Sequence, residues 1–320
     1  MKIVITGALG HIGSRMIRSL PDALPNLDIV MIDDLSSQRY ASLFNLPTKA
    51  TYRFVETDVA RNDIAPFIED ADVVLHLAAI TDATSSFQNR EKVERNNLEA
   101  TRRVVEACGK AGAALIHLSS TSVYGTQASV VDEECAAGDL KPQSPYAETK
   151  LQEEDLVLTA ARYGLRAVSC RFGTIFGTSP GMRFHTAVNK FCWQAVMGQP
   201  LTVWRTAYEQ RRPYLDLEDA VRAVVFFIQK NLFDGRVYNV VTCNKTVRNV
   251  VDHIRTHVPG LQTKFVDTEI MNQLSYAVEN TRMNKAGFTF AGDMARGVSE
   301  TTALLQRSNI AQSSRAVSNA

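Results

Sequence analysis

The stretch KIVITGALGHIGSRMIRSL, residues 2–20, decides the fold, because a short β-branched run is followed at once by three glycines and a helical pattern. It predicts a strand over Lys2–Thr6 and a helix over His11–Leu20. Gly7 permits the tight turn between them, Gly10 lets the backbone approach a pyrophosphate, and Gly13 allows close packing of helix on strand. The helix N-terminus offers unpaired N–H groups to phosphates. We therefore expect a dinucleotide-binding turn with contacts from Gly7, Gly10, His11, Ile12 and Gly13.

The same order of strand then helix recurs through the first half of the chain. Such alternation is typical of an α/β fold with a Rossmann-type doubly wound parallel sheet, whose ligands lie beyond the carboxyl ends of the strands. The expected strands are Lys2–Thr6, Asp28–Ile32, Tyr52–Val55, Asp72–His76, Ala114–Leu118 and Arg166–Arg171. The expected helices are His11–Leu20, Ser37–Phe44, Asp63–Ile68, Val93–Lys110 and Tyr146–Tyr163.

The pattern becomes irregular after Gly173, where glycines and prolines interrupt it, and we expect a smaller α+β substrate lobe there. Its expected helices and strands are Phe184–Met197, Glu218–Lys230, Val247–His257, Leu201–Trp204 and Val237–Val241. The expected organisation is a dinucleotide-binding Rossmann domain of residues 1–172, to which 214–242 return, a substrate lobe of 173–213 and 243–306, and a disordered tail of 307–320.

The composition excludes several classes of protein. A net charge of +1 over 320 residues argues against a nucleic-acid surface. Apolar stretches such as Ala220–Ile228 fall short of the roughly 20 residues that a membrane helix needs. The five cysteines have neither disulfide-framework nor metal-site spacing, and the N-terminus lacks a signal-peptide pattern. We expect a cytoplasmic protein with no metal and no nucleic-acid or membrane partner.

Asp33 stands directly after the second expected strand, about 20 residues beyond Gly13. A carboxylate at this place accepts hydrogen bonds from both ribose hydroxyls of the adenosine and repels a 2′-phosphate. The expected cofactor is therefore NAD rather than NADP. The alternative rests on Arg39, which could reach a phosphate if the following loop folds back.

Tyr146 and Lys150 stand four residues apart in one expected helix, so their side chains project from the same face. A tyrosine with the ordinary pKa of about 10 is not a base at neutral pH. A nearby ammonium and the positive ring of an oxidised nicotinamide favour the phenolate and lower that pKa. The pair is a candidate for proton transfer with a hydroxyl group, although such spacing also occurs on surface helices.

Several motifs together resemble the extended short-chain dehydrogenase/reductase family. They are the G-x-x-G-x-x-G turn, Tyr146-Ala147-Glu148-Thr149-Lys150, His76-Leu77-Ala78-Ala79, Asn97, and the segment SSTSVYG at 119–125. The resemblance runs from Lys2 to about Leu305. It is closest to the nucleotide-sugar epimerases and dehydratases, of which UDP-galactose 4-epimerase is the best known.

The resemblance implies that Tyr146 is the base, that Lys150 also holds the nicotinamide ribose, and that Ser120 binds the same hydroxyl. It implies further cofactor contacts from Asp58, Val59, Leu77, Ala78, Ala79 and Asn97. It implies substrate contacts from Thr81, Ser120, Thr121, Tyr146, Thr174, Arg183 and Arg212. Plainer roles stay open for three of these: Asp58 as a strand-end cap, Asn97 as a helix-surface residue and Thr81 as a loop polar residue.

An arginine in a Gln-x-Arg-Asp-Phe/Tyr segment commonly clamps the nucleotide diphosphate in that family, and Gln210-Arg211-Arg212-Pro213-Tyr214 is similar. Arg212 is the expected clamp, and the alternative is a structural ion pair with Asp216 or Glu218. Thr174 replaces an asparagine that contacts substrate in the family, and Trp204-Arg205-Thr206 replaces a Gly-Asp turn. These departures imply another sugar or base than a standard UDP-galactose epimerase takes.

The resemblance leaves several reactions open from a common 4-keto sugar. Sugar 4,6-dehydratases carry an acidic pair, or at least a glutamate, just after the Ser/Thr, whereas Thr121 and Ser122 cannot do that acid–base work. We expect an NAD-dependent nucleotide-sugar 4-epimerase or 4-dehydrogenase, paired as a homodimer through helices 93–110 and 146–163. The alternatives are a 4,6-dehydratase, a short-chain dehydrogenase of a small non-nucleotide alcohol, and a non-catalytic NAD-sensing protein.

Overall fold

The computed structural model describes residues 1–81, 85–125, 129–267 and 275–307. The expected disordered tail lies outside these residues except for Arg307. The helices are α1 (His11–Ala23), α2 (Ala65–Ile68), α3 (Arg90–Ala111), α4 (Pro145–Arg162), α5 (Ala187–Val196), α6 (Leu217–Gln229), α7 (Val247–His257), α8 (Thr281–Lys285) and α9 (Met294–Gln306). The strands are β1 (Lys2–Thr6), β2 (Leu27–Asp33), β3 (Ala50–Glu56), β4 (Val73–His76), β5 (Ala114–Ser120), β6 (Val130–Val131), β7 (Ala167–Phe172), β8 (Thr174–Phe176), β9 (Leu201–Trp204), β10 (Arg211–Asp216), β11 (Asp234–Val240), β12 (Cys243–Thr246), β13 (Thr263–Val266) and β14 (Ala277–Val278).

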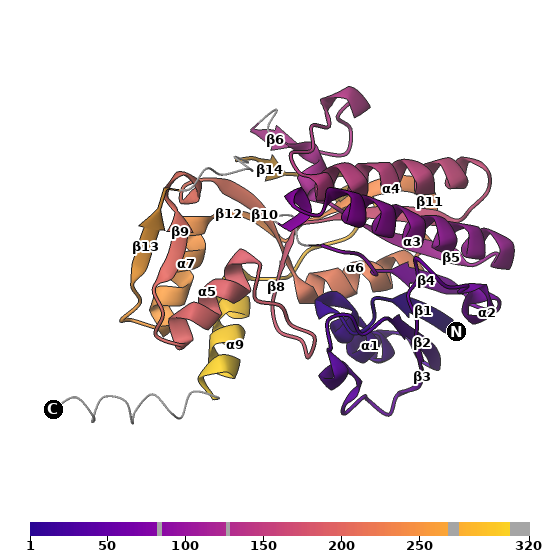
Figure 1. The fold of residues 1–320 in the computed structure, drawn as a ribbon, viewed down its shortest axis with the longest axis horizontal. Helices are drawn as coiled ribbons and strands as arrows, with labels where there is room; N and C mark the ends of the chain where they lie inside the picture. Colours follow the sequence, from indigo (N-terminus) through magenta and orange to yellow (C-terminus); the bar gives the residue numbers. More distant parts are fainter. Residues whose placement is uncertain (82–84, 126–128, 268–274, 308–320) are drawn as a thin grey trace.

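Seven parallel strands form the large sheet in the order β11-β7-β5-β4-β1-β2-β3. The chain begins at β1, adds β2 and β3 on one side, and then crosses to β4 on the other side. The direction of winding therefore switches between β1 and β4, which is where a doubly wound sheet binds its ligand. The predicted doubly wound parallel sheet is confirmed, and all six strands expected in the first half are present (Figure 1).

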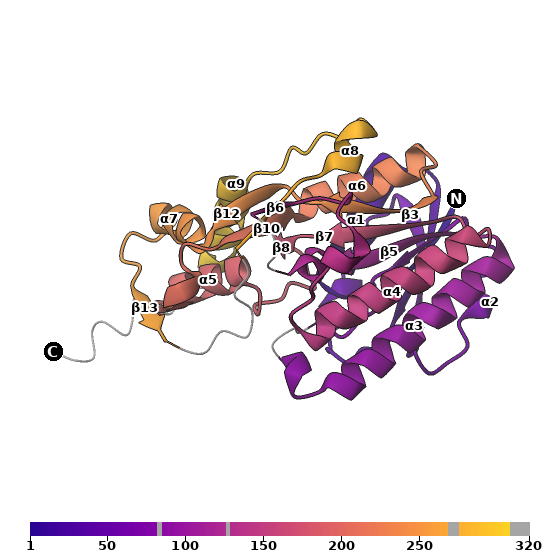
Figure 2. The same cartoon turned by 90° about the horizontal axis from the view of Figure 1, so that it is seen from above.

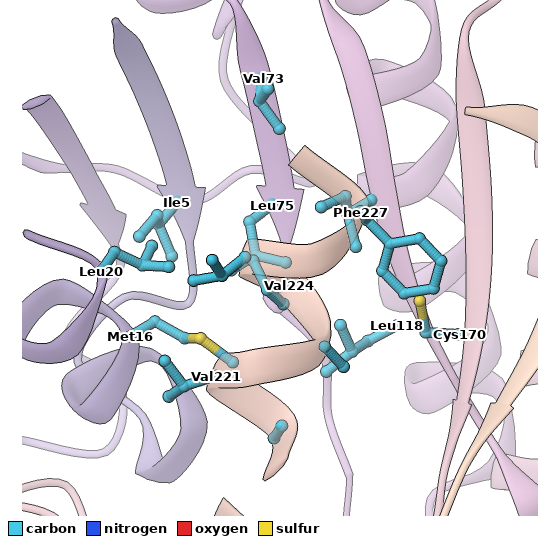
Figure 3. Close-up of a cluster of buried hydrophobic side chains, with 14 of the residues drawn as sticks. Ile5, Met16, Leu20, Val73, Leu75, Leu118, Cys170, Val221, Val224 and Phe227 are labelled. Atoms are coloured by element: carbon cyan, nitrogen blue, oxygen red, sulfur yellow. The ribbon is translucent and has the colours of Figure 1, made fainter. Parts of the chain in front are cut away.

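Helices cover both faces of the large sheet, as the burial of successive residues along strands such as β1 and β4 requires. Ile3 and Ile5 of β1 pack on the face covered by α1 and α6, where Met16 and Phe227 are buried (Figure 3). Val4 points to the other face, which α2, α3 and α4 cover. Figure 2 shows α3 and α4 side by side on one face, with α1 and α6 on the opposite one. This layered packing holds the carboxyl ends of β1, β4 and β5 in fixed register.

One expected helix is wrong. Over Ser37–Phe44 the structure has only a short 3₁₀ turn, Tyr40–Leu43. Leu35 and Gln38 adopt positive φ angles of 54° and 52°, in the left-handed region that an α-helix of L-residues does not use. The segment after β2 therefore folds as a compact loop beside the glycine turn.

The later chain forms a second group of elements beside the large sheet (Figure 1). It contains a three-stranded sheet in the order β12-β10-β8 and the pair β13-β9. Helices α5, α7 and α9 pack around a separate apolar core that includes Phe176, Val188, Ile254 and Val298. The strand β11 pairs instead with β7 at the edge of the large sheet, and α6 packs on that sheet as well. Within the described residues, no helix is both long and apolar enough to span a membrane.

Candidate active site

The structure places Ser120 and Tyr146 near each other at the carboxyl end of the large sheet, where the Ser120 side chain acts to lower the pKa of Tyr146 against the effect of burial. Ser120 is the last residue of β5, and Tyr146 is in the first turn of α4. The helix begins there because the Ser144 hydroxyl caps the backbone N–H of Ala147 and Pro145 follows at the first helical position. Lys150, one turn further along α4, is buried and donates a hydrogen bond to the Leu118 carbonyl at 3.0 Å. The end of β5 and the start of α4 therefore bring the three predicted catalytic residues together.

The two residues after Ser120 have different surroundings. Ser122 donates to Ser120 Oγ from its backbone N–H at 3.2 Å and from its hydroxyl at 2.9 Å. Thr121 is buried, and its hydroxyl donates to the Phe172 carbonyl of β7 at 3.3 Å. The Thr121 carbonyl accepts from the hydroxyl of Tyr276 at 2.8 Å. Thr121 is thus tied into the fold, whereas Ser122 orients Ser120.

The acidity of Tyr146 differs from the sequence expectation. Burial raises the pKa of the Tyr146 hydroxyl above its ordinary value, and it outweighs the opposing effects of Lys150 and Arg183. A net lowering of this pKa is therefore wrong for the protein chain alone. Lys150 still favours the phenolate, and a positive ring bound beside Tyr146 would act in the same direction.

At two positions of the N-terminal turn there is no room for any side chain, so only glycine fits. Gly7 has a φ of +65°, and a Cβ there would lie 2.7 Å from the backbone nitrogen of Ala78. A Cβ on Gly13 would lie 2.4 Å from the Gly7 carbonyl oxygen. Asp33 stabilises the same turn, because its Oδ2 accepts from the Leu9 N–H at 3.0 Å. Burial raises the pKa of this carboxyl group. Glycine turn and carboxylate are therefore held in one rigid arrangement.

A cavity of about 600 Å³ lies at the switch point between β1 and β4. Its lining includes most of the expected cofactor contacts: Gly7, Gly10, His11, Ile12, Gly13, Asp33, Asp58, Val59, Leu77, Ala78 and Ala79. Thr81 and Arg183, expected to contact substrate, also line it. The Thr81 hydroxyl is buried and has no hydrogen-bond partner among the described residues, so it is available to a ligand. Asn97, Ser120, Tyr146 and Lys150 lie outside this lining, as do Thr121, Thr174 and Arg212.

The open alternatives for Asn97 and Asp58 can be compared with their contacts. Asn97 is fully buried, and its side-chain amide accepts from the Ile80 N–H at 2.8 Å and donates to the Ile80 carbonyl at 3.0 Å. It is therefore not a helix-surface residue, and it shapes the loop after β4. Asp58 accepts from the Ala60 N–H at 2.8 Å while it lines the cavity, so it has the contacts of a strand-end cap.

Arg39 has folded back toward the glycine turn, as the NADP alternative required. A Cβ built on Gly10 would lie 3.8 Å from its Nη1, and Arg39 lines the cavity. Burial lowers the pKa of its guanidinium and Asp33 acts against that lowering. The two opposite charges therefore face the same end of the cavity.

A loop from the later chain closes over the glycine turn, which the sequence did not reveal. His11 Nε2 and the Gly177 carbonyl are hydrogen-bonded at 3.0 Å, and the Gly181 N–H donates to Ser14 Oγ at 2.9 Å. A Cβ on Gly181 would lie 2.3 Å from the Leu9 carbonyl oxygen, so only glycine fits. Burial lowers the pKa of His11 to about 4. In the sequence, the spacing of four residues between Gly177 and Gly181 was the feature that could have indicated this contact.

The expected phosphate clamp lies on β10, beside the strand that carries Thr174. Tyr214 of β10 is in register with Thr174 of β8. Arg212 donates to Gln210 Oε1 at 3.0 Å, and burial lowers the pKa of its guanidinium. Asp216 was the alternative ion-pair partner of Arg212, but its carboxylate pairs with Arg296 at 3.1 Å. The same carboxylate caps α6. Glu218 lies 4.0 Å from the same Arg296.

In the described part of the chain, no three histidine, cysteine, aspartate or glutamate residues form a group that could hold a metal ion.

The chain is similar to several known proteins. A family model described as the NAD dependent epimerase/dehydratase family matches residues 3–240. The chain is 31% identical over 324 residues to the trifunctional UDP-glucose 4,6-dehydratase/UDP-4-keto-6-deoxy-D-glucose 3,5-epimerase/UDP-4-keto-L-rhamnose-reductase RHM2 of Arabidopsis thaliana. That match covers 93% of this chain and 46% of the relative, so the chain spans about half the length of these curated relatives. It is also 31% identical over 251 residues to the uncharacterized UDP-glucose epimerase YtcB of Bacillus subtilis, covering 75% of this chain and 76% of that protein.

Solved structures extend the likeness over nearly the whole chain. MoeE5 in complex with UDP-glucuronic acid and NAD is 26% identical, with a TM-score of 0.82 over 96% of this chain and 100% of that chain. The UDP-glucuronic acid 4-epimerase from Bacillus cereus, in complex with UDP-glucuronic acid and NAD, shares the fold at 23% identity. Its TM-score is 0.84, over 96% of this chain and 99% of that chain.

Proposed function

The chain belongs to the NAD-dependent epimerase/dehydratase family, and from that premise we propose that it is a nucleotide-sugar 4-epimerase working through a 4-keto sugar. The observation that carries this proposal is the placement of Ser120, at the end of β5, beside Tyr146, with Lys150 one turn further along α4. The arrangement supplies one group to take a proton from a hydroxyl and a second group to hold that hydroxyl.

The residues of the cavity fit NAD. The N-terminus of α1 offers the backbone N–H groups of His11 and Ile12 to a pyrophosphate, and Asp33 offers a carboxylate to the adenosine ribose. We assign Arg39 to the phosphates, because Asp33 beside it disfavours a 2′-phosphate. When bound, NAD accepts a hydride from the sugar carbon and can return it. Residues 1–172 with 214–242 are proposed to hold NAD, and 173–213 with 243–306 to hold the sugar nucleotide.

The protein groups move one proton in each direction. Tyr146 as the phenolate takes the proton of the sugar 4-hydroxyl as C4 is oxidised to the ketone, and it returns the proton when the ketone is reduced. Ser120 holds the same oxygen with a hydrogen bond. The Lys150 ammonium favours the phenolate and is assigned to the nicotinamide ribose. An epimer forms when the ketone turns over within the site before it is reduced.

The names of the trifunctional plant relatives include a UDP-glucose 4,6-dehydratase activity, and two residues argue against dehydration here. In sugar 4,6-dehydratases, the residues after the Ser/Thr include an acid that moves the C5 proton and expels the C6 hydroxyl. In this chain the Thr121 hydroxyl is used by the Phe172 carbonyl, and the Ser122 hydroxyl is used by Ser120. Neither side chain has an ionisable group for that work.

The closed loop favours an epimerase over a 4-dehydrogenase. A dehydrogenase must release its reduced cofactor in every turnover, whereas an epimerase uses the cofactor again in place. Gly177 and Gly181 hold the loop on the glycine turn, and Arg183 of the same loop lines the cavity. This closure supports retention of NAD through the cycle.

The substrate is proposed to be a nucleoside diphosphate sugar. Arg212 and Arg183 are assigned to its phosphates, and Thr81 and Thr174 to its polar groups; the MoeE5 complex with UDP-glucuronic acid supports this class. We also propose a homodimer, since the half-buried Leu151, Leu156 and Leu158 supply apolar surface on α4 outside the core. Light scattering of the purified protein measures its mass in solution, and we expect twice the mass of one chain.

The experiment is to incubate the purified protein with NAD and a panel of UDP-, GDP-, CDP- and dTDP-sugars, UDP-glucuronic acid included. Product chromatography separates an epimer from a ketone, and absorbance reports reduced cofactor. We expect a C4 epimer from at least one nucleotide sugar, and no conversion by Tyr146→Phe.

Tyr163→Phe is the matched control, because Tyr163 is 89% exposed at the end of the same helix. It should convert the substrate at the wild-type rate. Turnover of a small alcohol but of no nucleotide sugar would contradict the proposed substrate class.

A further inference from the structure

A buried carboxylate lies beneath the proposed catalytic pair. Glu153 is three residues after Lys150 on α4, and its side chain is 1% exposed. Its Oε2 accepts from Lys150 Nζ at 2.8 Å, His117 Nε2 at 3.0 Å and Thr101 Oγ1 at 3.0 Å. No described residue hydrogen-bonds to its Oε1. A buried charge is unfavourable unless it is paired, so Glu153 is not a neutral filler of the core.

The hydrogen bonds around Glu153 can be assigned a single direction. Since Thr101 donates to Glu153, its oxygen accepts from His76 Nε2 at 3.2 Å. His76 Nδ1 then accepts from the Thr6 hydroxyl at 2.7 Å. The Thr6 oxygen in turn accepts from the backbone N–H groups of Leu77 and Ala78, which line the cavity.

The second branch runs through His117. This histidine donates from Nε2 to Glu153, and its Nδ1 is hydrogen-bonded to the Ser169 hydroxyl at 3.0 Å. In the first branch, burial lowers the pKa of His76 to about 3, so its ring is neutral. An ordered network thus runs from the cavity wall to Glu153, where every donor points at one carboxylate oxygen.

The charges in this region are coupled. Burial alone would raise the pKa of Glu153, but Lys150 and His117 outweigh it and hold that pKa well below the ordinary value. Burial alone would lower the pKa of Lys150, but Glu153 outweighs it and raises that pKa. Glu153 therefore favours the ammonium form of Lys150, together with Tyr146 and Glu154.

Two of the three Lys150 N–H groups are occupied, by the Leu118 carbonyl and by Glu153. The ammonium is thereby held in one position, and its third N–H is left for the catalytic side. The other groups facing Glu153 or its partners are Tyr146 and Glu154 on α4, His117 on β5, His76 on β4, Arg171 on β7 and Arg183 in the loop after β8. Glu154 is paired with Arg171 at 2.7 Å, so Glu153 is the carboxylate that acts on Lys150 directly.

We propose that Glu153 is a positioning residue for proton transfer: it fixes the Lys150 ammonium beside Tyr146 and offsets its charge, so that Tyr146 stays protonated until a cofactor brings further positive charge. The proposal rests on the proposed roles of Tyr146 and Lys150. With Glu153 present, the buried group of Lys150, Glu153 and neutral Tyr146 has no net charge. Ionisation of Tyr146 then leaves a net negative charge in a buried site, which burial opposes.

The test is a titration of tyrosinate absorbance that needs no substrate. The signal of Tyr146 is the difference between each protein and its Tyr146→Phe counterpart, recorded without NAD. In Glu153→Gln the carboxylate that opposes ionisation of Tyr146 is gone, while Lys150 keeps its hydrogen bond to the Leu118 carbonyl. We expect the Tyr146 midpoint to move about 1 pH unit lower, the size of shift that one nearby charge produces.

Two further variants separate charge from position. Asp155→Asn removes an exposed carboxylate from the same helix, and its midpoint should equal that of the wild type. Glu153→Asp keeps the charge on a shorter side chain, so the midpoint should return toward the wild-type value. With an active nucleotide sugar, kcat should fall in Glu153→Asp while KM stays unchanged, because Glu153 does not contact the sugar.

An unchanged or higher midpoint in Glu153→Gln would overturn the proposal. Should that variant fail to fold, Thr101→Val serves instead: it removes one donor that offsets the Glu153 charge, so the midpoint should rise, and an unmoved midpoint contradicts the proposal. Failure of every nucleotide sugar to react would sink the proposed function but leave this titration valid.

Discussion

The hydroxyl of Ser122 lies 2.9 Å from that of Ser120 and donates to it, and the Ser122 N–H reaches the same oxygen at 3.2 Å. Ser120 Oγ therefore accepts two hydrogen bonds, and its own hydrogen is left to donate to a third group. By family resemblance, a dehydratase carries an acidic residue near this position. Here a second hydroxyl orients the first, which fits simple proton exchange at one sugar oxygen.

Ser122→Ala should lower kcat by about threefold to tenfold, the effect of one hydrogen bond between neutral groups, without changing the proton donor. The backbone N–H of Ser122 remains and keeps Ser120 partly oriented. Steady-state kinetics with the active nucleotide sugar check this. A rate equal to that of the wild type would show that the Ser122 hydroxyl does not act on Ser120.

Asp33→Asn should weaken NAD binding by about 10-fold to 150-fold, because hydrogen bonds to a charged group contribute roughly 1.5–3 kcal/mol. The amide oxygen can still accept from the Leu9 N–H, so the turn should keep its shape. NADP should lose less affinity than NAD, since the repulsion of a 2′-phosphate disappears while Arg39 remains. Isothermal titration calorimetry of the cofactor-free protein measures the affinities for NAD and for NADP. Asp34→Asn is the control, because Asp34 is exposed and beside it.

Arg212→Ala should raise KM for the nucleotide sugar by about tenfold or more while kcat changes little, since a phosphate clamp binds ground state and transition state alike. Arg211→Ala is the matched control, because Arg211 precedes it on β10 and is exposed. An unchanged KM in Arg212→Ala would show that the diphosphate is held elsewhere or is absent from the substrate.

Stability should fall as the pH drops from about 6.5 toward 4, the interval between the ordinary and the folded-state pKa of His11. Burial lowers the pKa of His11 in the folded protein to about 4, so the folded protein favours the neutral ring. Below about 6.5 the unfolded chain binds a proton at His11 that the folded protein does not. The free energy of unfolding therefore decreases as the pH falls through this interval. His76, with a pKa of about 3, acts in the same direction. Thermal unfolding at pH 7 and pH 5 measures the effect. In His11→Asn the stability should depend less on pH. An equally steep loss of stability in that variant would show that other groups cause the pH dependence.

Much of the large sheet could be predicted from the sequence because several of its strands, such as β1 and β4, are local apolar runs buried on both faces. The loop that replaces the expected Ser37–Phe44 helix could not be predicted, because Leu35 and Gln38 adopt a conformation that propensity does not foresee. Ser120, Tyr146 and Lys150 were found because their spacing along one strand end and one helix is itself informative. Glu153 was missed because its partners come from α3 and β5, although its spacing from Lys150 was a signal.

The most direct test of the central claim uses a nucleotide sugar that carries deuterium at C4, chosen from the panel by its turnover. The account predicts a mixture of the two C4 epimers in which the deuterium stays at C4, with no reduced cofactor accumulating in solution. A ketone that accumulates together with reduced cofactor, or a product that has lost water, would contradict it.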